Sequence, residues 1–245
     1  MKALVVTSRV TFVPRNYDTL IAGLADCPQV GGLLVLDNRS LSLVGQAAGL
    51  ILIGARRIGW SLLRNAFDSG GRRRRAYAAH GKPTWTLKTI NSPEAVELVK
   101  SNAFDVVVNA RTRYIYKADI LRAPRLGCIN IHHGLLPEQR GTMCDLWALH
   151  ERGPAGFTIH QMNEKIDAGK LVARVEVSDG SDRDYLAYLA KSCLRELETV
   201  QRVLVDTERQ DSIAGTPNTA PPGLVHRHNP TREQIGEMKR GGLRL

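Results

Sequence analysis

The chain has 245 residues, 43% of them hydrophobic, which is enough for one sizeable α/β domain followed by a tail. Its 34 lysines and arginines outnumber its 24 acidic residues and give a net charge of +10. Positions 56–75 hold seven arginines and one acid, so this segment supplies six of the ten excess charges, which argues against a nucleic-acid surface across the whole protein.

The cysteines and the N-terminus exclude two further classes. The four cysteines are far apart and form no CxxC pair, so we expect no zinc site of the usual spacing and infer reduced thiols in a cytoplasmic protein. The opening run, MKALVVTSRV, is too short for a signal peptide and predicts a first strand instead.

The first half of the chain predicts a βαβ unit that is interrupted by an insertion. Buried strands at 2–8 and 30–38 flank a helical segment, as in a doubly wound sheet. Residues 41–69 are strongly apolar and predict helices, although the uninterrupted apolar part is too short to span a bilayer. The run GGRRRR at 70–75 predicts a loop in solvent.

The second half returns to the α/β pattern. A helix is expected from Ser92, which would cap it, with Pro93 at its first position. The other expected elements are strands at 84–87, 104–110, 128–133, 155–162 and 170–178, and helices near 117–122, 143–151 and 181–207. The alternating polarity of VARVEV in the last strand favours antiparallel pairing.

Together these elements predict an α/β fold with a Rossmann-like, doubly wound and mostly parallel sheet. We expect one domain over residues 1–207, with a helical and basic insertion at about 41–80. A short C-terminal tail at 208–245 is rich in Pro, Thr, Asn and Gly, and we expect it to run over the domain surface.

The strand in CINIHHGLLPEQRG, residues 128–141, carries unusual polar residues. Asn130 and His132 are two apart and share one face, whereas His133 faces the other way. Ligands bind at the carboxyl ends of strands in open α/β sheets, and an amide beside an imidazole suits acyl transfer. The alternative is a pair of core polar residues that backbone groups satisfy; two polar groups on one buried face favour a functional reason.

This stretch and the sequence that follows it resemble the catalytic domain of the formyltransferases that use N10-formyltetrahydrofolate. The shared pattern runs in order through an Asn-x-His pair, a Leu-Leu-Pro turn, an Arg-Gly pair, a Trp-Ala pair, a Gly-x-Thr-x-His strand and an Asp-x-Gly turn. In this chain these are Asn130 and His132, 135–137, 140–141, 147–148, 156–160 and 167–169.

The resemblance implies catalytic roles for Asn130, His132 and Asp167. Asn130 and a protonated His132 would stabilise the oxyanion that forms when an amine attacks the formyl carbon. Asp167 would favour the charged imidazole and help to relay protons. Taken alone, Asp167 could equally be an ordinary turn residue before glycine.

The resemblance also implies N10-formyltetrahydrofolate as co-substrate, with its pterin ring between two backbone loops. The side chains expected there are Arg113, Tyr114, Ile115 and Tyr116 in the first loop and Asn163, Glu164 and Ile166 in the second. NAD is not expected, because TSRVTF after the first strand lacks the G-x-G-x-x-G pattern. The same loops could also be plain turns at strand ends.

The acceptor is expected to be a small-molecule amine or hydroxylamine, such as an amino sugar nucleotide or a specialised metabolite. The first strand is not followed by the glycine-rich loop of the ribonucleotide-binding members, and the residues after 207 are too few for the C-terminal barrel of the methionyl-tRNA members. Nucleic acid is therefore not the expected partner. Arg9, Arg15, His133 and Gly134 are the candidate acceptor-binding residues, with a surface role as the alternative for both arginines.

Three alternatives stay open at this stage. The chain could be a formyltetrahydrofolate hydrolase, or a non-catalytic module that docks a partner or a membrane surface through residues 41–75. A metal site built from the histidines has no carboxylate or cysteine arrangement to complete it. We expect the insertion to pack on the domain or on a second subunit, as in a homodimer, through Leu50, Ile53, Trp60 and Leu63.

Overall fold

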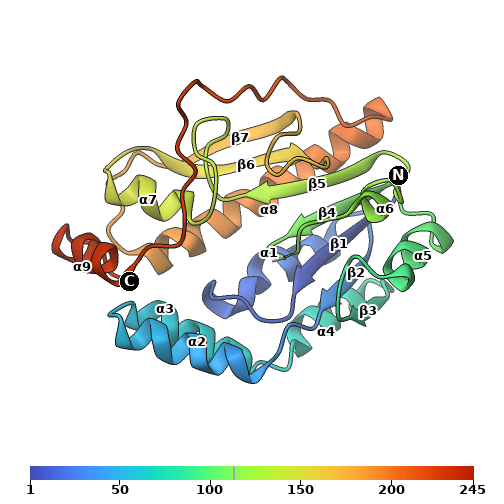
Figure 1. The fold of residues 1–245 in the computed structure, drawn as a ribbon. Helices are drawn as coiled ribbons and strands as arrows, with labels where there is room; N and C mark the ends of the chain where they lie inside the picture. Colours follow the sequence, from blue (N-terminus) through green and yellow to red (C-terminus); the bar gives the residue numbers. More distant parts are fainter. Residues whose placement is uncertain (113) are drawn as a thin grey trace.

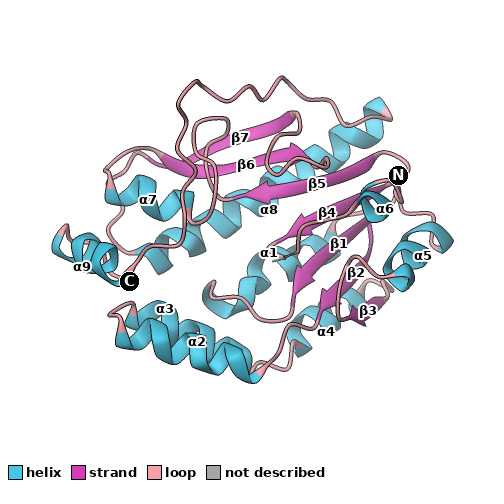
Figure 2. Cartoon of the chain, in the orientation of Figure 1, coloured by secondary structure: helices cyan, strands magenta, loops and turns pink. Residues whose placement is uncertain are grey.

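The computed structural model describes residues 1–112 and 114–245 as one seven-stranded sheet with helices on both faces (Figures 1 and 2). The strand order is β3-β2-β1-β4-β5-β6-β7. The strands are β1 (Ala3–Ser8), β2 (Val30–Leu36), β3 (Thr84–Leu87), β4 (Val106–Ala110), β5 (Gly127–His132), β6 (Ala155–Gln161) and β7 (Leu171–Ser178). The α-helices are α1 (Asp18–Gly23), α2 (Leu41–Leu52), α3 (Arg56–Ala66), α4 (Gly71–Ala79), α5 (Pro93–Ser101), α6 (Ala118–Leu121), α7 (Cys144–His150), α8 (Tyr185–Gln210) and α9 (Arg232–Arg240).

The predicted α/β sheet is confirmed. Strands β1 to β5 pair in parallel. Strand β6 pairs antiparallel with β5, and β7 pairs antiparallel with β6. The parallel strand β1 is buried along its whole length, and its apolar residues alternate between two cores because successive side chains point to opposite faces. Val5 packs into the core under α1 and α8, and Leu4 into the core under α5 and α6.

The connections place the functional end of the sheet. The chain runs outward from β1 to β2 and β3, then returns to the other side of β1 for β4 and β5. Ligands bind at the carboxyl ends of strands where an open sheet changes direction in this way. The ends of β4 and β5 lie at that edge, and their carboxyl-terminal residues Asn109 and Asn130 are partners in register.

The arginine run corrects one prediction. Residues 71–79 form helix α4 and not a solvent-exposed loop. Arg73 is buried because α4 packs on α1, where the Nε atom of Arg73 lies 2.5 Å from Oδ1 of Asp18 and a guanidinium nitrogen donates to the carbonyl of Ser8. Neighbouring residues on a helix point in different directions, so Arg72, Arg74 and Arg75 stay exposed.

The insertion is helical, as predicted, and three of its four expected contact residues pack within the chain. Helices α2 and α3 pack on each other, and Leu50, Ile53 and Leu63 are half-buried. Trp60 is 58% exposed because it lies on the outer side of α3, whereas Ile58 on the inner side is buried.

The tail does more than run over the surface. Isolated bridges join residues 216, 227 and 244 to the main domain, and α9 begins with a capping box between Thr231 and Gln234. Ile235 and Met238 are buried against the domain, and the backbone nitrogen of Arg57 in α3 donates to the carbonyl of Leu245. Figure 1 shows α9 beside α3. None of the described helices is both long and apolar enough to cross a membrane.

Candidate active site

A cavity of about 1200 Å³ lies at the carboxyl ends of β4 and β5. Its wall includes the ends of these strands, the loop that ends at Asp167, the two insertion helices and part of the tail. Single-ligand pockets commonly measure about 300–1,000 Å³, so this space could hold a co-substrate and an acceptor together.

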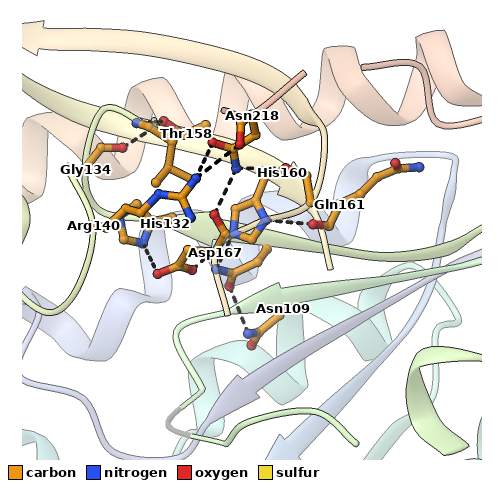
Figure 3. Close-up of polar contacts among 12 residues, drawn as sticks. Asn109, His132, Gly134, Arg140, Thr158, His160, Gln161, Asp167 and Asn218 are labelled. Carbon is orange, nitrogen blue, oxygen red and sulfur yellow. Dashed lines mark hydrogen bonds and ion pairs between the residues drawn. The ribbon is translucent and has the colours of Figure 1, made fainter. Parts of the chain in front are cut away.

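His132 lines the cavity and lies between two oxygen acceptors, one of which, Asp167, is labelled beside it in Figure 3. Its Nε2 atom lies 2.8 Å from the carbonyl oxygen of Gln139, and its Nδ1 atom lies 3.4 Å from Oδ2 of Asp167. Both ring nitrogens can donate only in the protonated ring. The arrangement therefore fits an imidazolium ion, and a neutral ring would leave one of the two contacts without a proton.

Asn130 is fixed by its neighbours on both sides. Its side-chain oxygen accepts a hydrogen bond of 2.9 Å from Asn109, whose own oxygen accepts from Thr112. Its Nδ2 atom lies 3.1 Å from Nε2 of His160, which also lies 3.4 Å from Oδ1 of Asp167, while Nδ1 of His160 donates to the carbonyl of Gln161. Asn130 thus keeps a second amide hydrogen for a ligand, because an amide nitrogen carries two.

Asp167 is held in place by the backbone turn and by the tail. Its φ is +50°, in the left-handed region, which aspartate tolerates better than most residues other than glycine and asparagine. The side chain of Asn218 donates to the carbonyls of Asp167 and Gly169, both at 2.9 Å, and accepts from Arg140. A side chain at Gly169 would place its Cβ 1.9 Å from the carbonyl oxygen of Gln161, so glycine is required there.

The charges of this group are coupled. Burial raises the pKa of Asp167, but hydrogen bonding to His160 and the nearby charges of His132 and Arg140 outweigh burial and hold it below the ordinary value. Burial lowers the pKa of His132, and the Asp167 carboxylate and the Gln139 carbonyl oppose that change. The pKa of His132 stays below its ordinary value because burial is the largest effect, and the ionised Asp167 limits the fall.

His133, the next residue, belongs to a separate buried network. Its Nδ1 atom lies 2.5 Å from a guanidinium nitrogen of Arg111 and 3.1 Å from Oδ2 of Asp145, and its Nε2 atom lies 3.2 Å from Oε1 of Glu196. Burial and the charge of Arg111 lower the pKa of His133 to about 4, and burial raises the pKa of Glu196 far above the ordinary value. Burial therefore favours the neutral form of both groups.

The two expected pterin loops reach the cavity. Tyr114, Ile115 and Tyr116 line it from one loop, and Asn163, Glu164 and Ile166 line it from the other; Arg113 lies outside the described residues. Ile115 and Ile166 are 67% and 64% exposed. An isoleucine from each loop leaves apolar surface that a flat ring between the loops would cover.

The predicted acceptor-binding residues divide into two groups. His133 lines the cavity, but Arg9, Arg15 and Gly134 do not, and Arg9 instead donates to the carbonyl of Ser69. At Gly134 a Cβ atom would lie 2.8 Å from Nε2 of His132 and from the carbonyl oxygen of Gln139. The missing side chain at Gly134 therefore makes room for the hydrogen bond between His132 and Gln139.

Sequence reasoning missed several residues of the site. Asn109 and His160 were visible as polar residues in otherwise apolar strands, and their positions beside Asn130 follow from strand pairing. Gln139 acts through its backbone, so its side chain gave no signal. Asn218 lies in a segment of low complexity, and only the fold brings it to Asp167. Within the described part of the chain, no three His, Cys, Asp or Glu residues are grouped to hold a metal ion.

A Rossmann-like sheet here brings an amide, an imidazole and a carboxylate together around one cavity, and such groups can stabilise an oxyanion and move a proton. The chain belongs to the formyl transferase family, whose model matches residues 68–192, so the family predicted from the Asn-x-His motif is confirmed. It is 40% identical over 99 residues to methionyl-tRNA formyltransferase of Geobacillus thermodenitrificans, covering 40% of this chain and 31% of that protein. With the enzyme of Bacillus subtilis the identity is 33% over 147 residues, 56% of this chain and 46% of the relative. The chain thus spans less than half the length of either relative.

Solved structures share the fold at lower identity. A 4-N formyltransferase from Francisella tularensis superposes with a TM-score of 0.58 at 18% identity, covering 98% of this chain and 87% of that one. A phosphoribosylglycinamide formyltransferase from Anaplasma phagocytophilum gives a TM-score of 0.61 at 17% identity, covering 92% and 96%. These similarities support the α/β architecture and leave the acceptor open.

Proposed function

We propose that this protein transfers a formyl group from N10-formyltetrahydrofolate directly to an amine or hydroxylamine of a small molecule. The observation that carries the proposal is the convergence of Asn130, His132 and Asp167 on one wall of a cavity with room for two ligands. Membership of the formyl transferase family supports the chemistry.

The co-substrate fits the residues that line the cavity. Exposed Ile115 and Ile166 supply apolar surface on two facing loops, where a pterin ring would pack. When bound, N10-formyltetrahydrofolate supplies an electrophilic formyl carbon. The chain has to orient that carbon, stabilise charge on its oxygen and move one proton.

The side chains divide this work. The free amide hydrogen of Asn130 and the ring of His132 would donate to the formyl oxygen as negative charge develops there. The acceptor nitrogen bonds to the formyl carbon as the bond from that carbon to N10 breaks, so one proton must leave the acceptor nitrogen and one must reach N10. His132 is the group that can carry it, and Asp167 keeps it protonated when required.

A transfer assay tests the proposal directly. Tetrahydrofolate should be released only as fast as formylated amine appears, whereas a hydrolase would release it without any amine. A protein that bound tetrahydrofolate and catalysed neither reaction would fit the non-catalytic module. Absence of tetrahydrofolate binding by calorimetry would reject the proposal.

Methionyl-tRNA is a second candidate acceptor, because the two curated relatives act on it by name. It should therefore be included in the acceptor panel beside amino sugar nucleotides. A cytoplasmic location, a homodimer, and the division into a catalytic domain at 1–207, an insertion at about 41–80 and a tail at 208–245 also remain proposals. Light scattering tests the dimer.

A further inference from the structure

The cavity has a second half that the co-substrate loops do not reach. Its wall is built by the loop after β1, the two insertion helices, and α9 with the residues that follow it. The apolar side chains there are Phe12, Leu50, Ile53, Ile58, Ile235 and Leu245. We call this half the apolar chamber. The network of Arg111, His133 and Asp145 lies at its base.

The cations of the cavity are poorly placed to hold a phosphate group in the chamber. Among the described lining residues these are Arg111, Arg227 and Lys165, apart from histidines. Arg111 contacts His133 at 2.5 Å, and Arg227 contacts Glu151 at 2.5 Å. Lys165 lies on the loop beside the expected pterin site. A nucleotide acceptor would thus meet apolar walls and engaged cations.

We propose that the acceptor is an amine carried on an apolar body, an alkyl or aralkyl amine, and that the insertion helices α2 and α3 bind that body. This inference rests on the proposed function and names the substrate class of the same site. Burial of apolar surface drives binding in such a chamber, and each methylene group removed from water strengthens it about fourfold. The amine end would point towards His132.

A chain-length series tests the substrate class. With tetrahydrofolate bound, calorimetry should show affinity rising about threefold to fourfold for each methylene from propylamine to octylamine. With N10-formyltetrahydrofolate, kcat/KM for formylation should rise in the same order. An amino sugar nucleotide and methionyl-tRNA serve as the polar comparisons.

Leu50 and Leu52 form a matched pair of variants on one helix. Leu50 lines the chamber, whereas Leu52 is 80% exposed. Leu50→Gln should reduce kcat/KM for octylamine about tenfold or more, and Leu52→Gln should leave it unchanged, with the affinity for tetrahydrofolate equal in both. Leu50→Phe keeps the position apolar and should shorten the longest amine that the enzyme accepts. This second variant keeps the test valid if Leu50→Gln fails to fold.

The outcomes separate this inference from the proposed function. If tetrahydrofolate binds and the amino sugar nucleotide or methionyl-tRNA is formylated while octylamine neither binds nor reacts, the apolar acceptor is wrong and formyl transfer stands. A flat chain-length series also overturns it. If tetrahydrofolate does not bind, the proposed function fails first.

A separate observation concerns the outer face of the same insertion. Helix α2 contains no charged residue, and its solvent side carries Leu41, Val44 and Leu52 at helical spacing. Leu41 is 92% exposed, and Phe67 just after α3 is 79% exposed. Exposed leucines on an uncharged helix leave apolar surface in water, and such a surface commonly marks a site of contact with a partner or a membrane.

Exposed arginines follow this apolar segment along the chain. Arg56 and Arg64 lie one helical turn before and after the exposed Trp60. In the part of the chain that the structure describes, no ion pair engages five exposed arginines: Arg56, Arg64, Arg72, Arg74 and Arg75. Asp37 is paired with Arg39, so the acids nearby do not neutralise the face.

We infer that the outer face of α2 and α3 docks on an anionic lipid bilayer. Leucine, tryptophan and phenylalanine beside arginine are the residues that hold a helix in the interface of such a bilayer, where the apolar side enters and the arginines meet lipid phosphates. The exposed leucines favour lipid over nucleic acid as the source of negative charge. This inference names a lipid bilayer as the partner for the docking through residues 41–75 that the sequence left open.

Vesicle flotation tests the docking. The protein should float with equimolar phosphatidylglycerol and phosphatidylcholine, bind pure phosphatidylcholine far less, and detach partly at high salt. The double variant Leu52→Gln and Trp60→Gln should weaken flotation about tenfold or more, whereas Val225→Gln, at an exposed position in the tail, should not. Leu50→Gln should float normally, the reverse of its effect on transfer.

Three results would overturn the docking. They are absence of flotation, equal flotation with neutral and anionic vesicles, and a dimer by light scattering that the double variant abolishes, which would assign the face to a second copy of the chain. Binding of RNA that competes with vesicles and survives the double variant would assign the arginines to nucleic acid.

Discussion

The adjacent residues His132 and His133 occupy two different electrostatic environments on the two faces of one strand. His132 faces the cavity and is paired with Asp167, which keeps some solvent exposure. His133 faces the opposite core, where Asp145 and Glu196 are fully buried. Both rings contact carboxyl groups and both line the cavity, but the Asp167 carboxylate keeps some solvent exposure, whereas the Asp145 carboxylate is fully buried.

A contact between a histidine and a carboxylate is therefore not sufficient to identify a catalytic pair. On the His132 side, the hydrogen bond to Gln139 leaves the ring beside the cavity, where it can exchange a proton. On the His133 side, the ring connects Arg111 to Glu196. We expect changes on the first side to affect turnover, and changes on the second side to affect stability.

His132→Ala should have the largest effect. It removes a donor to the formyl oxygen and the proton carrier, and loss of one preorganised donor alone typically costs about a hundredfold to a thousandfold in kcat. Tetrahydrofolate affinity should stay unchanged if the pterin is held by backbone loops. Steady-state kinetics and calorimetry measure both, and near-normal turnover would reject the assigned mechanism.

Asp145→Ala should act on the other side, through stability. The change removes the acceptor of hydrogen bonds from Tyr185 and from the backbone of Leu146 and leaves the charge of Arg111 without its buried counter-charge. Breaking a buried pair typically costs about 3–5 kcal/mol. Urea denaturation measures the loss, with exposed Asp179→Ala as control. Equal unfolding free energies for the two variants would contradict the structural role.

Asp167→Asn should change the pH dependence of transfer. The Asp167 carboxylate opposes the effect of burial on the pKa of His132, so removing its charge lowers that pKa further. Activity that needs protonated His132 falls as pH rises through its pKa, and the fall should therefore move to lower pH in the variant. The pH profile of kcat/KM measures the shift. A limb that stays in place or moves to higher pH would argue against protonated His132 as the active form.

Glu196→Gln should have the smallest effect. Burial raises the pKa of Glu196 in the folded protein above its ordinary value of 4.5, so the wild-type protein loses stability as pH rises from that value towards the raised one. Glutamine does not titrate, and the variant should gain relative stability with pH, by at most about 1.4 kcal/mol per pH unit. Urea denaturation from pH 5 to 8 measures the gain, and activity should be retained. Parallel stability curves would contradict a neutral Glu196.

Local sequence patterns were sufficient to predict most of the sheet. The buried runs at 2–8 and 30–38, the alternation in 170–178 and the cap at Ser92 all predicted elements that the structure contains. The prediction of a loop at 70–75 was wrong, because a row of like charges is also typical of a solvent-exposed loop. The helix there is stabilised by one long-range ion pair between Arg73 and Asp18, which no local pattern reveals.

The family and the candidate trio could be predicted from the sequence alone, because Asn130, His132 and Asp167 follow a motif with fixed order and spacing. Strand geometry also separated His132 from His133, since successive residues point to opposite faces. These are local properties of the chain.

The residues that surround the trio could be identified only from the tertiary structure. Asn218 reaches Asp167 across 51 positions of sequence, and the insertion helices meet α9 at the wall of the apolar chamber. Contacts of this kind depend on how distant segments pack, and the pKa of a buried group depends on the charges that packing brings near it. Burial favours the neutral forms of His133 and Glu196 for that reason, and packing brought together the side chains of the apolar chamber in the same way.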